Sequence, residues 1–434
     1  MRDRGIIWDE GYEGKRDQRV TVARTIRVHQ NWVHTDAPPP PEASSMTDLP
    51  GAYLPSMREI ERIEPNGFRV VSTFSGCGGS CLGFRMAGYT TVFASEFIPA
   101  AQETYRANHP GVYLDTRDIR QLSAEDILAV TGLSKGEVDV LEGSPPCASF
   151  SMAGKREAGW NKAKAYSDTK QRVDDLFFEY ARIVDGLQPR VFVAENVKGL
   201  TIGVARGYLK EILNALRGCG YVVKCAVMDA QYFRVPQHRE RLIFVGVRKD
   251  LGIEPTFPKP QSKPMALREA LPWIARRGAN AAFGTVADVP SSLPCGTIGA
   301  SPQTGNGRSN PSQCIAEVDI SRYAIGDEWD KLKPGEQSKR YFSLQKAHPD
   351  KACPTITQTS GTVMSAAGVT HPFEKRKFTI AELRRICGFP DDFILTGTFA
   401  RQWERLDRAV APPMMKAIAE HIRDTILVPA RDVT

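Results

Sequence analysis

The chain has 434 residues, of which 41% are hydrophobic and 25% charged, with a formal net charge of +7 at pH 7 and a pI of about 8.9. No run of about 18 apolar residues is present that could cross a membrane as a helix, and the mild positive charge permits a nucleic-acid partner. Seven histidines and nine cysteines are scattered without zinc-finger spacing, so we expect no metal site, no disulfide framework and an intracellular protein.

The predicted elements begin after an N-terminal extension at 1–66. Its proline-rich stretch at 36–45 is typical of a stiff linker, and we expect the extension to be partly disordered. From 67 to 250, short β-rich runs alternate with amphipathic helical stretches, which predicts an α/β fold with a doubly wound, mostly parallel sheet and helices on both faces. The strand runs lie at 68–74, 90–96, 138–144, 190–196, 221–229 and 241–248, and the helical stretches include 98–109, 173–187 and 208–220.

Residues 251–371 are rich in Pro, Gly, Ser and Thr and show no sustained period. About 120 such residues are too many for one loop, so we predict a second, smaller domain there. Helical patterning returns at 372–434, which we assign to the first domain. A capping box opens a helix at 379–389, and a last helix is predicted at 412–426.

The first motif with chemical content is the glycine-rich segment Phe-Ser-Gly-Cys-Gly-Gly-Ser at 74–80, between a strand run and a helix. Its glycines would let backbone N–H groups approach a ligand at the helix N-terminus. Glu96 ends the next strand run, at the distance from Gly76 at which a carboxylate meets ribose hydroxyls in nucleotide-binding α/β sites. The turn lacks the dinucleotide pattern G-x-G-x-x-G, which disfavours NAD. The motif favours another adenosine-containing cofactor, whose adenine amino group Asp118 could bond. A mere tight strand-to-helix turn is the alternative.

The second motif, Gly-Ser-Pro-Pro-Cys at 143–147, follows the third strand run. Ligands of doubly wound sheets gather outside the carboxyl ends of the strands. Two prolines stiffen this loop, so Cys147 is predicted to be presented to the pocket as a candidate nucleophile, provided that a nearby cation or helix N-terminus stabilises its thiolate. The alternative is a chemically inert cysteine that behaves as a small hydrophobic residue.

Two further motifs place charged residues at strand ends. Glu195, in Ala-Glu-Asn-Val at 194–197, is a candidate general acid, or else a cap of the following helix. Arg239 and Arg241 lie two residues apart on a strand and therefore point to the same face. That placement suits an anion or the edge of a base, and the alternative is a solvated cluster of charges.

The order of these motifs resembles the cytosine-5 DNA methyltransferases, which depend on S-adenosylmethionine. Residues 174–200 are similar to that family's stretch leading into its Glu-Asn-Val, and 376–393 resemble its ninth motif. The likeness covers about 68–425. It implies a Rossmann-like methyltransferase fold with a target-recognition domain at 251–371. It also implies a protein that acts on double-stranded DNA in the cytoplasm or nucleoid of a bacterial or phage-infected cell. We expect a monomer, because one catalytic unit can flip one base.

By this resemblance Cys147 is the nucleophile that adds to carbon 6 of cytosine, which gives carbon 5 the character of an enamine. Glu195 would bond the ring nitrogen and amino group of the base and donate a proton, for which it needs a raised pKa. Arg239 and Arg241 would orient the base, which must be flipped out of the duplex before carbon 6 can be reached. The DNA contacts that we assign are Ser149, Ser151, Gln237, Lys339 and Arg340.

The resemblance also implies the S-adenosylmethionine site, and it implies no metal. The site would be built from the glycine-rich turn, the ends of the neighbouring strands and the family's last motif. Its residues are Phe74, Ser75, Gly76, Gly78, Gly79, Glu96, Asp118, Ile119, Pro145, Arg408 and Val410.

The last motif departs from the family pattern. The family reads Gly-Asn-x-Val-x-Pro, whereas this chain reads Asp407-Arg408-Ala-Val410-Ala-Pro412. A cation at the Asn position gains nothing from the positive sulfonium of S-adenosylmethionine but would bond a donor that carries an added carboxylate. Arg408 therefore suggests carboxy-S-adenosylmethionine as donor and 5-carboxymethylcytosine as product. Ordinary methyl transfer, with Arg408 turned towards Asp407 or another acid, and loss of cofactor binding are the alternatives.

Two competing classes of protein stay open. One is an RNA cytosine-5 methyltransferase, against which the length of 251–371 argues, because RNA-directed relatives have a shorter region there. The other is a catalytically silent DNA-binding relative, which would have no need of Cys147, Glu195 and both arginines together.

Overall fold

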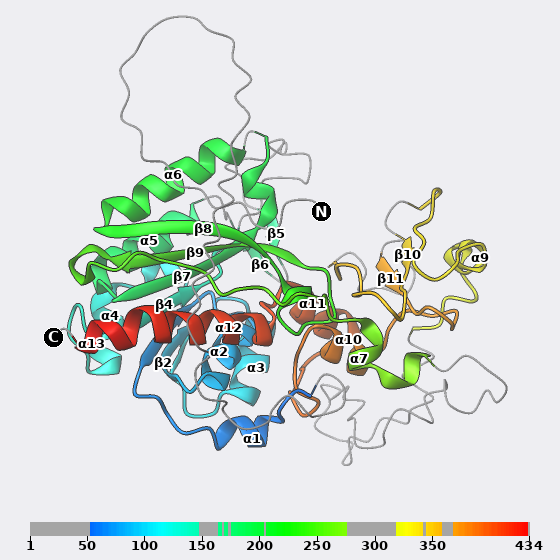
Figure 1. The fold of residues 1–434 in the computed structure, drawn as a ribbon, viewed down its shortest axis with the longest axis horizontal. Coiled ribbons are helices and arrows are strands. Elements are labelled where there is room, and N and C mark those ends of the chain that lie inside the picture. Colours follow the sequence, from blue (N-terminus) through cyan, green and yellow to red (C-terminus); the bar gives the residue numbers. More distant parts are fainter. Residues whose placement is uncertain are drawn as a thin grey trace, which may run out of the picture.

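The computed structural model describes residues 53–146, 164–166, 169–171, 175–203, 205–275, 318–341, 344–357 and 368–432. A seven-stranded sheet lies at its centre, with the strand order β3-β2-β1-β4-β7-β9-β8 (Figure 1). The first five strands in this order, from β3 to β7, run parallel to one another. Strand β9 is antiparallel to both of its neighbours, β7 and β8. The predicted doubly wound, mostly parallel sheet is confirmed. The strands are β1 Arg69–Thr73, β2 Thr90–Ser95, β3 Leu114–Asp115, β4 Val140–Gly143, β7 Val191–Val197, β8 Tyr221–Asp229 and β9 Glu240–Arg248.

Each face of the sheet has its own hydrophobic core, because alternate residues of a strand point to opposite sides. Val71 and Leu141 pack on one face against helices α4, α5 and α6. Their neighbours Val70 and Val140 pack on the other face with α2 and α12. Parallel strands buried on both faces read as continuous apolar runs, which is why the sequence revealed them. The helices that flank the sheet are α2 Gly79–Met86, α3 Pro99–Asn108, α4 Ala124–Thr131, α5 Leu176–Leu187, α6 Ala205–Gly218 and α12 Pro412–Ile422.

The remaining described elements lie beside the sheet or extend from it (Figure 1). Helix α10 begins at the predicted capping box, in which Thr379 and Glu382 bond each other's backbone N–H groups. The stretch 318–357 has a small hydrophobic cluster of its own around Trp329. A separate second domain at 251–371 stays a prediction. These elements are α1 Met57–Glu61, β5 Lys164–Tyr166, β6 Thr169–Gln171, α7 Leu267–Ala270, α9 Ala324–Asp330, β10 Leu344–Lys346, β11 Gly368–Thr370, α10 Ile380–Ile386, α11 Phe399–Arg408 and α13 Val428–Asp432.

The topology creates a switch point between β1 and β4. From β1 the chain adds β2 and β3 on one side, and β4 and β7 then continue on the other side. In such sheets the loops at the carboxyl ends of the two central strands diverge and leave a crevice for ligands. The crevice here is bounded by the loops that begin at Phe74 and Ser144. Across the described part of the chain, no helix is long and apolar enough to span a membrane.

Helices α2 and α12 approach each other closely at Gly83. A Cβ atom at this position would lie 2.6 Å from the Met415 Cβ and 2.7 Å from the Pro412 carbonyl oxygen. We therefore expect Gly83→Ala to lower the free energy of unfolding by about 1–3 kcal/mol, because backbone must shift to admit the methyl group. Urea unfolding followed by circular dichroism measures the change.

The matched control is Gly207→Ala in α6, where an added Cβ meets no atom within 4 Å. There the helix propensity of alanine should raise the free energy of unfolding, by up to about 1 kcal/mol. Equal stabilities for the Gly83→Ala variant and the unmodified protein would contradict the close packing of α2 on α12.

Candidate active site

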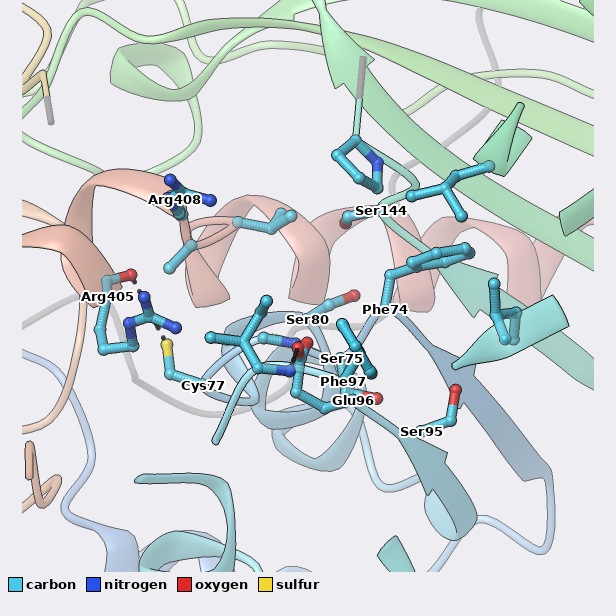
Figure 2. Close-up of a pocket in the computed structure, with 18 of the residues that line it drawn as sticks. Phe74, Ser75, Cys77, Ser80, Ser95, Glu96, Phe97, Ser144, Arg405 and Arg408 are labelled. Atoms are coloured by element: carbon cyan, nitrogen blue, oxygen red, sulfur yellow. Dashed lines mark hydrogen bonds between the residues drawn. The ribbon is translucent and has the colours of Figure 1, made fainter. Parts of the chain in front are cut away.

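A pocket of about 890 Å³, measured to its open mouth, lies at the switch point of the sheet. Figure 2 shows the glycine-rich turn and Glu96 in its centre, with Arg405 and Arg408 on one side and Phe74 and Ser144 on the other. Nine of the predicted donor-site residues line it, and they are Phe74, Ser75, Gly76, Gly79, Glu96, Asp118, Ile119, Arg408 and Val410.

The glycine-rich turn depends on glycine for its conformation and for its packing. Gly76 and Gly78 have φ values of +56° and +89°, in the left-handed region that side chains disfavour. Gly78 is the N-cap of α2 and, unlike its neighbours, does not line the pocket. A Cβ at Gly79 would lie 2.4 Å from the Val410 carbonyl oxygen, so the turn packs directly on the last motif. The turn is thus both a tight strand-to-helix connection and a wall of the pocket.

Glu96 is buried at the end of β2 and holds the turn in place. Its Oε2 accepts a hydrogen bond from the Gly76 N–H at 2.8 Å, and its Oε1 accepts one from the Ile98 N–H at 2.7 Å. Burial raises the pKa of Glu96, while these N–H groups and the charge of Arg405 oppose the rise. Each carboxylate oxygen has a second lone pair. Glu96 can therefore accept the hydroxyl groups of a ribose in addition to its backbone donors.

Asp118 and Ile119 form another wall of the pocket, ahead of α4. Asp118 caps a short helical turn by accepting a hydrogen bond from the Arg120 N–H at 3.0 Å. The Arg120 guanidinium joins Asp118 to Asp175 at the start of α5, at 2.9 Å and 2.6 Å. The carboxylate of Asp118 is thus fixed at the pocket, with capacity left to accept an N–H from a bound ligand.

Glu195 and Arg241 form an ion pair, with 2.8 Å between Oε1 and Nε. Strand β7 ends at Val197 and β9 begins at Glu240, and the antiparallel register pairs Val197 with Arg241. Both side chains are largely buried, and burial lowers the pKa of Arg241 to about 10. The sequence motifs Glu-Asn-Val and Gln-x-Arg-x-Arg therefore meet side by side in the fold.

The Pro-Pro-Cys loop is tethered to the same place. The Asn196 side chain donates a hydrogen bond to the Pro145 carbonyl oxygen at 3.0 Å, so the residue after Glu195 holds the loop that leads to the predicted nucleophile. Ser144 and Pro146 line the pocket, whereas Pro145 does not. Cys147, Ser149 and Ser151 lie outside the described residues.

Arg239 is buried and reaches the last motif rather than solvent. Its Nη2 donates hydrogen bonds to the carbonyl oxygens of Asp407 and Ala409, the latter at 3.0 Å. Gln237, which the sequence analysis assigns to DNA, is fully buried with its side-chain amide 3.5 Å from the Cys387 Sγ. In the described structure, Arg239 and Gln237 make contacts inside the protein with the segment after 372. Arg241 is the residue of this motif that pairs with Glu195.

Arg408 ends α11 and lines the pocket, as its motif position predicts. It pairs with Glu404, one turn earlier, at 2.9 Å between Nη2 and Oε1. Arg405, which the sequence analysis missed, also lines the pocket. The available signal was the spacing of Phe399, Trp403 and Leu406, which marks an amphipathic helix and would have placed both arginines on one element.

Lys339 and Arg340 lie in the stretch after α9 and do not line this pocket. Both are exposed, and the Arg340 guanidinium lies over the Tyr341 ring at 5.2 Å. No group of three or more His, Cys, Asp or Glu side chains within the described ranges is placed to hold a metal ion. The role of Lys339 and Arg340 in DNA binding stays a prediction.

Comparisons with known proteins agree with the sequence motifs. Residues 68–424 match the family model described as C-5 cytosine-specific DNA methylase. The Type II methyltransferase M1.HphI of Haemophilus parahaemolyticus is 31% identical over 81% of this chain and 86% of its own length. The Type II methyltransferase M.NgoPII of Neisseria gonorrhoeae is 30% identical over 83% of this chain and 97% of its own.

Solved structures share the fold at lower sequence identity. A protein described as a DNA modification methyltransferase encoded within an Escherichia coli prophage superposes with a TM-score of 0.61 at 22% identity, covering 83% of this chain and all of that one. A mutant of DNMT2 from Spodoptera frugiperda gives a TM-score of 0.52 at 18% identity, over 82% of this chain and 99% of that one. These likenesses concern the fold alone, and they confirm the predicted Rossmann-like methyltransferase architecture.

Proposed function

This chain belongs to the C-5 cytosine-specific DNA methylase family, and from that membership we propose that it transfers a methyl or carboxymethyl group to carbon 5 of a flipped cytosine in duplex DNA through a covalent adduct with Cys147. The observation that carries the proposal is the meeting of Glu195 and Arg241 at 2.8 Å, beside a loop that Asn196 tethers through Pro145. Three separate sequence motifs thereby converge where a base would have to be held.

The chemistry follows from the residue types. The Cys147 thiolate adds to carbon 6, forming a carbon–sulfur bond, while Glu195 gives a proton to the ring nitrogen of the base. Arg241 keeps the Glu195 carboxyl oriented towards the base. Carbon 5, now nucleophilic, would form a bond to the methyl or carboxymethyl carbon, while the carbon–sulfur bond of the donor breaks and the donor's sulfur leaves as a neutral thioether. A base then removes the carbon 5 proton, the carbon–sulfur bond breaks to release the thiolate, and the ring nitrogen returns its proton to Glu195.

The pocket at the switch point fits S-adenosylmethionine as the donor. Glu96 keeps lone pairs for ribose hydroxyls, Asp118 can accept an adenine N–H, and the open space beside Gly76 leaves its backbone accessible. Bound there, S-adenosylmethionine would supply an electrophilic methyl group. Its adenosine half would be held by the turn after β1, the end of β2 and the loop before α4.

A second candidate donor is favoured by a specific observation, the presence of Arg408 in the pocket wall. An arginine forms strong, charge-assisted hydrogen bonds with a carboxylate and has no attraction for a sulfonium. Both donors carry the carboxylate of their amino-acid part, but carboxy-S-adenosylmethionine has an added carboxylate on the group that is transferred. An Arg408 that bonds this added carboxylate would favour that donor, and the product would then be 5-carboxymethylcytosine. Glu404 binds one side of the Arg408 guanidinium, which orients the group without removing it from the pocket.

Arg408→Asn tests the choice of donor. We expect the preference for the carboxylated donor, expressed as the ratio of the two dissociation constants, to fall by about 10–100-fold, because a charged hydrogen bond is lost. Isothermal titration calorimetry with each donor measures the ratio, and mass spectrometry of nucleosides from treated DNA reports the product.

The matched control is Arg401→Asn. Arg401 lies on the same helix and also pairs with Glu404, at 3.0 Å, but it does not line the pocket. Its loss should leave the ratio unchanged. An Arg408→Asn variant with the donor preference of the unmodified protein would exclude Arg408 as the selector and leave ordinary methyl transfer.

The nucleic-acid class is tested by competition. We expect duplex DNA to be labelled from isotopically labelled donor, and an excess of transfer RNA to leave that labelling intact. Preferential labelling of the RNA would indicate an RNA cytosine-5 methyltransferase instead. Binding of DNA without labelling from either donor would indicate a catalytically silent relative.

A further inference from the structure

One buried carboxylate in α11 binds three arginines. Glu404 contacts Arg401 at 3.0 Å, Arg405 at 3.0 Å and Arg408 at 2.9 Å. The side chains of Glu404 and Arg405 are 6% and 4% exposed, so this ion pair lies largely outside water, whereas Arg408 and Arg401 are partly exposed, at 21% and 35%. Helical spacing explains the contacts with Arg401 and Arg408, because residues three or four apart lie on the same side of a helix. Arg405 is the next residue along the chain, and its guanidinium reaches back to Glu404.

The two oxygens of Glu404 divide the arginines between them. Oε1 contacts Arg408, and Oε2 contacts both Arg401 and Arg405. Of the three arginines, Arg405 and Arg408 line the pocket, and Figure 2 shows both on the same side of it. The positive charge of Arg405 also opposes the rise in the pKa of the buried Glu96, which lines the same pocket. One carboxylate thus fixes two cations of the pocket relative to each other.

We propose that Glu404 is a positioning residue that holds Arg405 and Arg408 as a paired binding site for the added carboxylate of carboxy-S-adenosylmethionine. The inference rests on the proposed carboxylated donor and adds a second contact residue, Arg405, and the group that orients both. In both ion pairs the contact to Glu404 is made by Nη2, one of the three nitrogens of a guanidinium.

Charge and geometry make opposite contributions at Glu404, and the test must separate them. Removal of the negative charge alone would make the pocket more attractive to an anion. Loss of the orientation would leave two mobile cations and weaken the bonds to a carboxylate. Glu404→Asp keeps the charge and shortens the side chain by one methylene group, so it breaks the geometry without changing the charge.

The experiment compares dissociation constants of S-adenosylmethionine and carboxy-S-adenosylmethionine by isothermal titration calorimetry, with the full chain and without DNA. We expect Glu404→Asp to lower the preference for the carboxylated donor about tenfold and to leave the affinity for S-adenosylmethionine within about threefold. Arg405→Gln should lower the preference similarly while Arg408 is still present. Glu420→Asp is the matched control, because Glu420 forms an (i, i+4) pair with Lys416 on the neighbouring helix α12.

The outcomes are distinguishable. A fall with Arg408→Asn but none with Glu404→Asp or Arg405→Gln overturns the paired site and leaves the proposed donor standing. Equal losses of both affinities with Glu404→Asp show a merely structural role and overturn the positioning role. If the unmodified protein prefers the carboxylated donor no more than the Arg408→Asn variant does, the result refutes the proposed donor and this inference as well. If Glu404→Asp does not fold, Arg405→Gln alone decides.

Discussion

Cys147→Ala is expected to reduce the rate of cytosine modification by about 10⁴-fold or more, because the chain then has no nucleophile to form the carbon–sulfur bond at carbon 6. Isotope transfer to duplex DNA measures the rate. DNA that contains 5-fluorocytosine adds a second readout. The fluorine cannot leave carbon 5 as a cation, so the unmodified protein should stay covalently attached to such DNA in denaturant and the variant should not.

Cys219→Ala is the control for Cys147→Ala. Cys219 is half-buried at the end of α6, where its thiol donates to the Ala215 carbonyl oxygen, and it has no place in the proposed site. Its loss should leave the rate unchanged. Product formation by Cys147→Ala at the rate of the unmodified protein would refute the covalent mechanism.

Glu195→Gln is expected to lower kcat by about 10²–10⁴-fold, the usual contribution of a general acid, since the amide can bond the base but cannot give it a proton. Single-turnover rates on duplex DNA with saturating donor measure the effect. Arg241 also loses its charged partner, so thermal unfolding of the variant must be recorded alongside the rate.

Glu240→Gln controls for the loss of a carboxylate at this strand end. Glu240 is the next residue to Arg241 and pairs with Lys198 at 2.7 Å, on the partly exposed side of β9. It should retain activity within a few-fold. A Glu195→Gln variant with an undiminished rate at every pH would show that the proton comes from another group.

The sheet was largely predictable because its central strands are buried on both faces. The runs at 90–96 and 190–196 correspond to β2 and β7 with ends shifted by only a residue, since hydrophobicity and the flanking turns mark the strands. Strand β3, Leu114–Asp115, was missed, because two residues are too few to show a period. Helix α4 was missed as well, although Ser123 and Asp126 form a capping box at its start.

The pocket residues whose positions follow from the backbone could be predicted from the sequence. The ion-pair partners of the charged side chains could not. The glycine-rich turn and Glu96 lie where their spacing predicts, because a strand, a tight turn and a helix leave little freedom. Arg408 was placed by its motif, but its partner Glu404 was not identified. A helix as charged as α11 resembles a solvated surface in sequence, and only the fold shows that Glu404 and Arg405 are buried.

Gln237 shows the opposite difficulty. The resemblance implies a contact of Gln237 with DNA, whereas the fold buries its side chain beside Cys387, and its contact with DNA stays a prediction. The sequence alone does not reveal that the returning segment after 372 covers this strand end. Cys147, Ser149 and Ser151 stay predictions that rest on the family's motifs.

The central claim is the transfer of a methyl or carboxymethyl group to carbon 5 of cytosine in duplex DNA. Its most direct test is mass spectrometry of nucleosides from a mixed-sequence duplex pool incubated with the full chain and either S-adenosylmethionine or its carboxylated form. We predict 5-methylcytosine from the first donor and 5-carboxymethylcytosine from the second, with every other nucleoside unchanged. Unmodified cytosine with both donors, or modification of a different base, would contradict the claim.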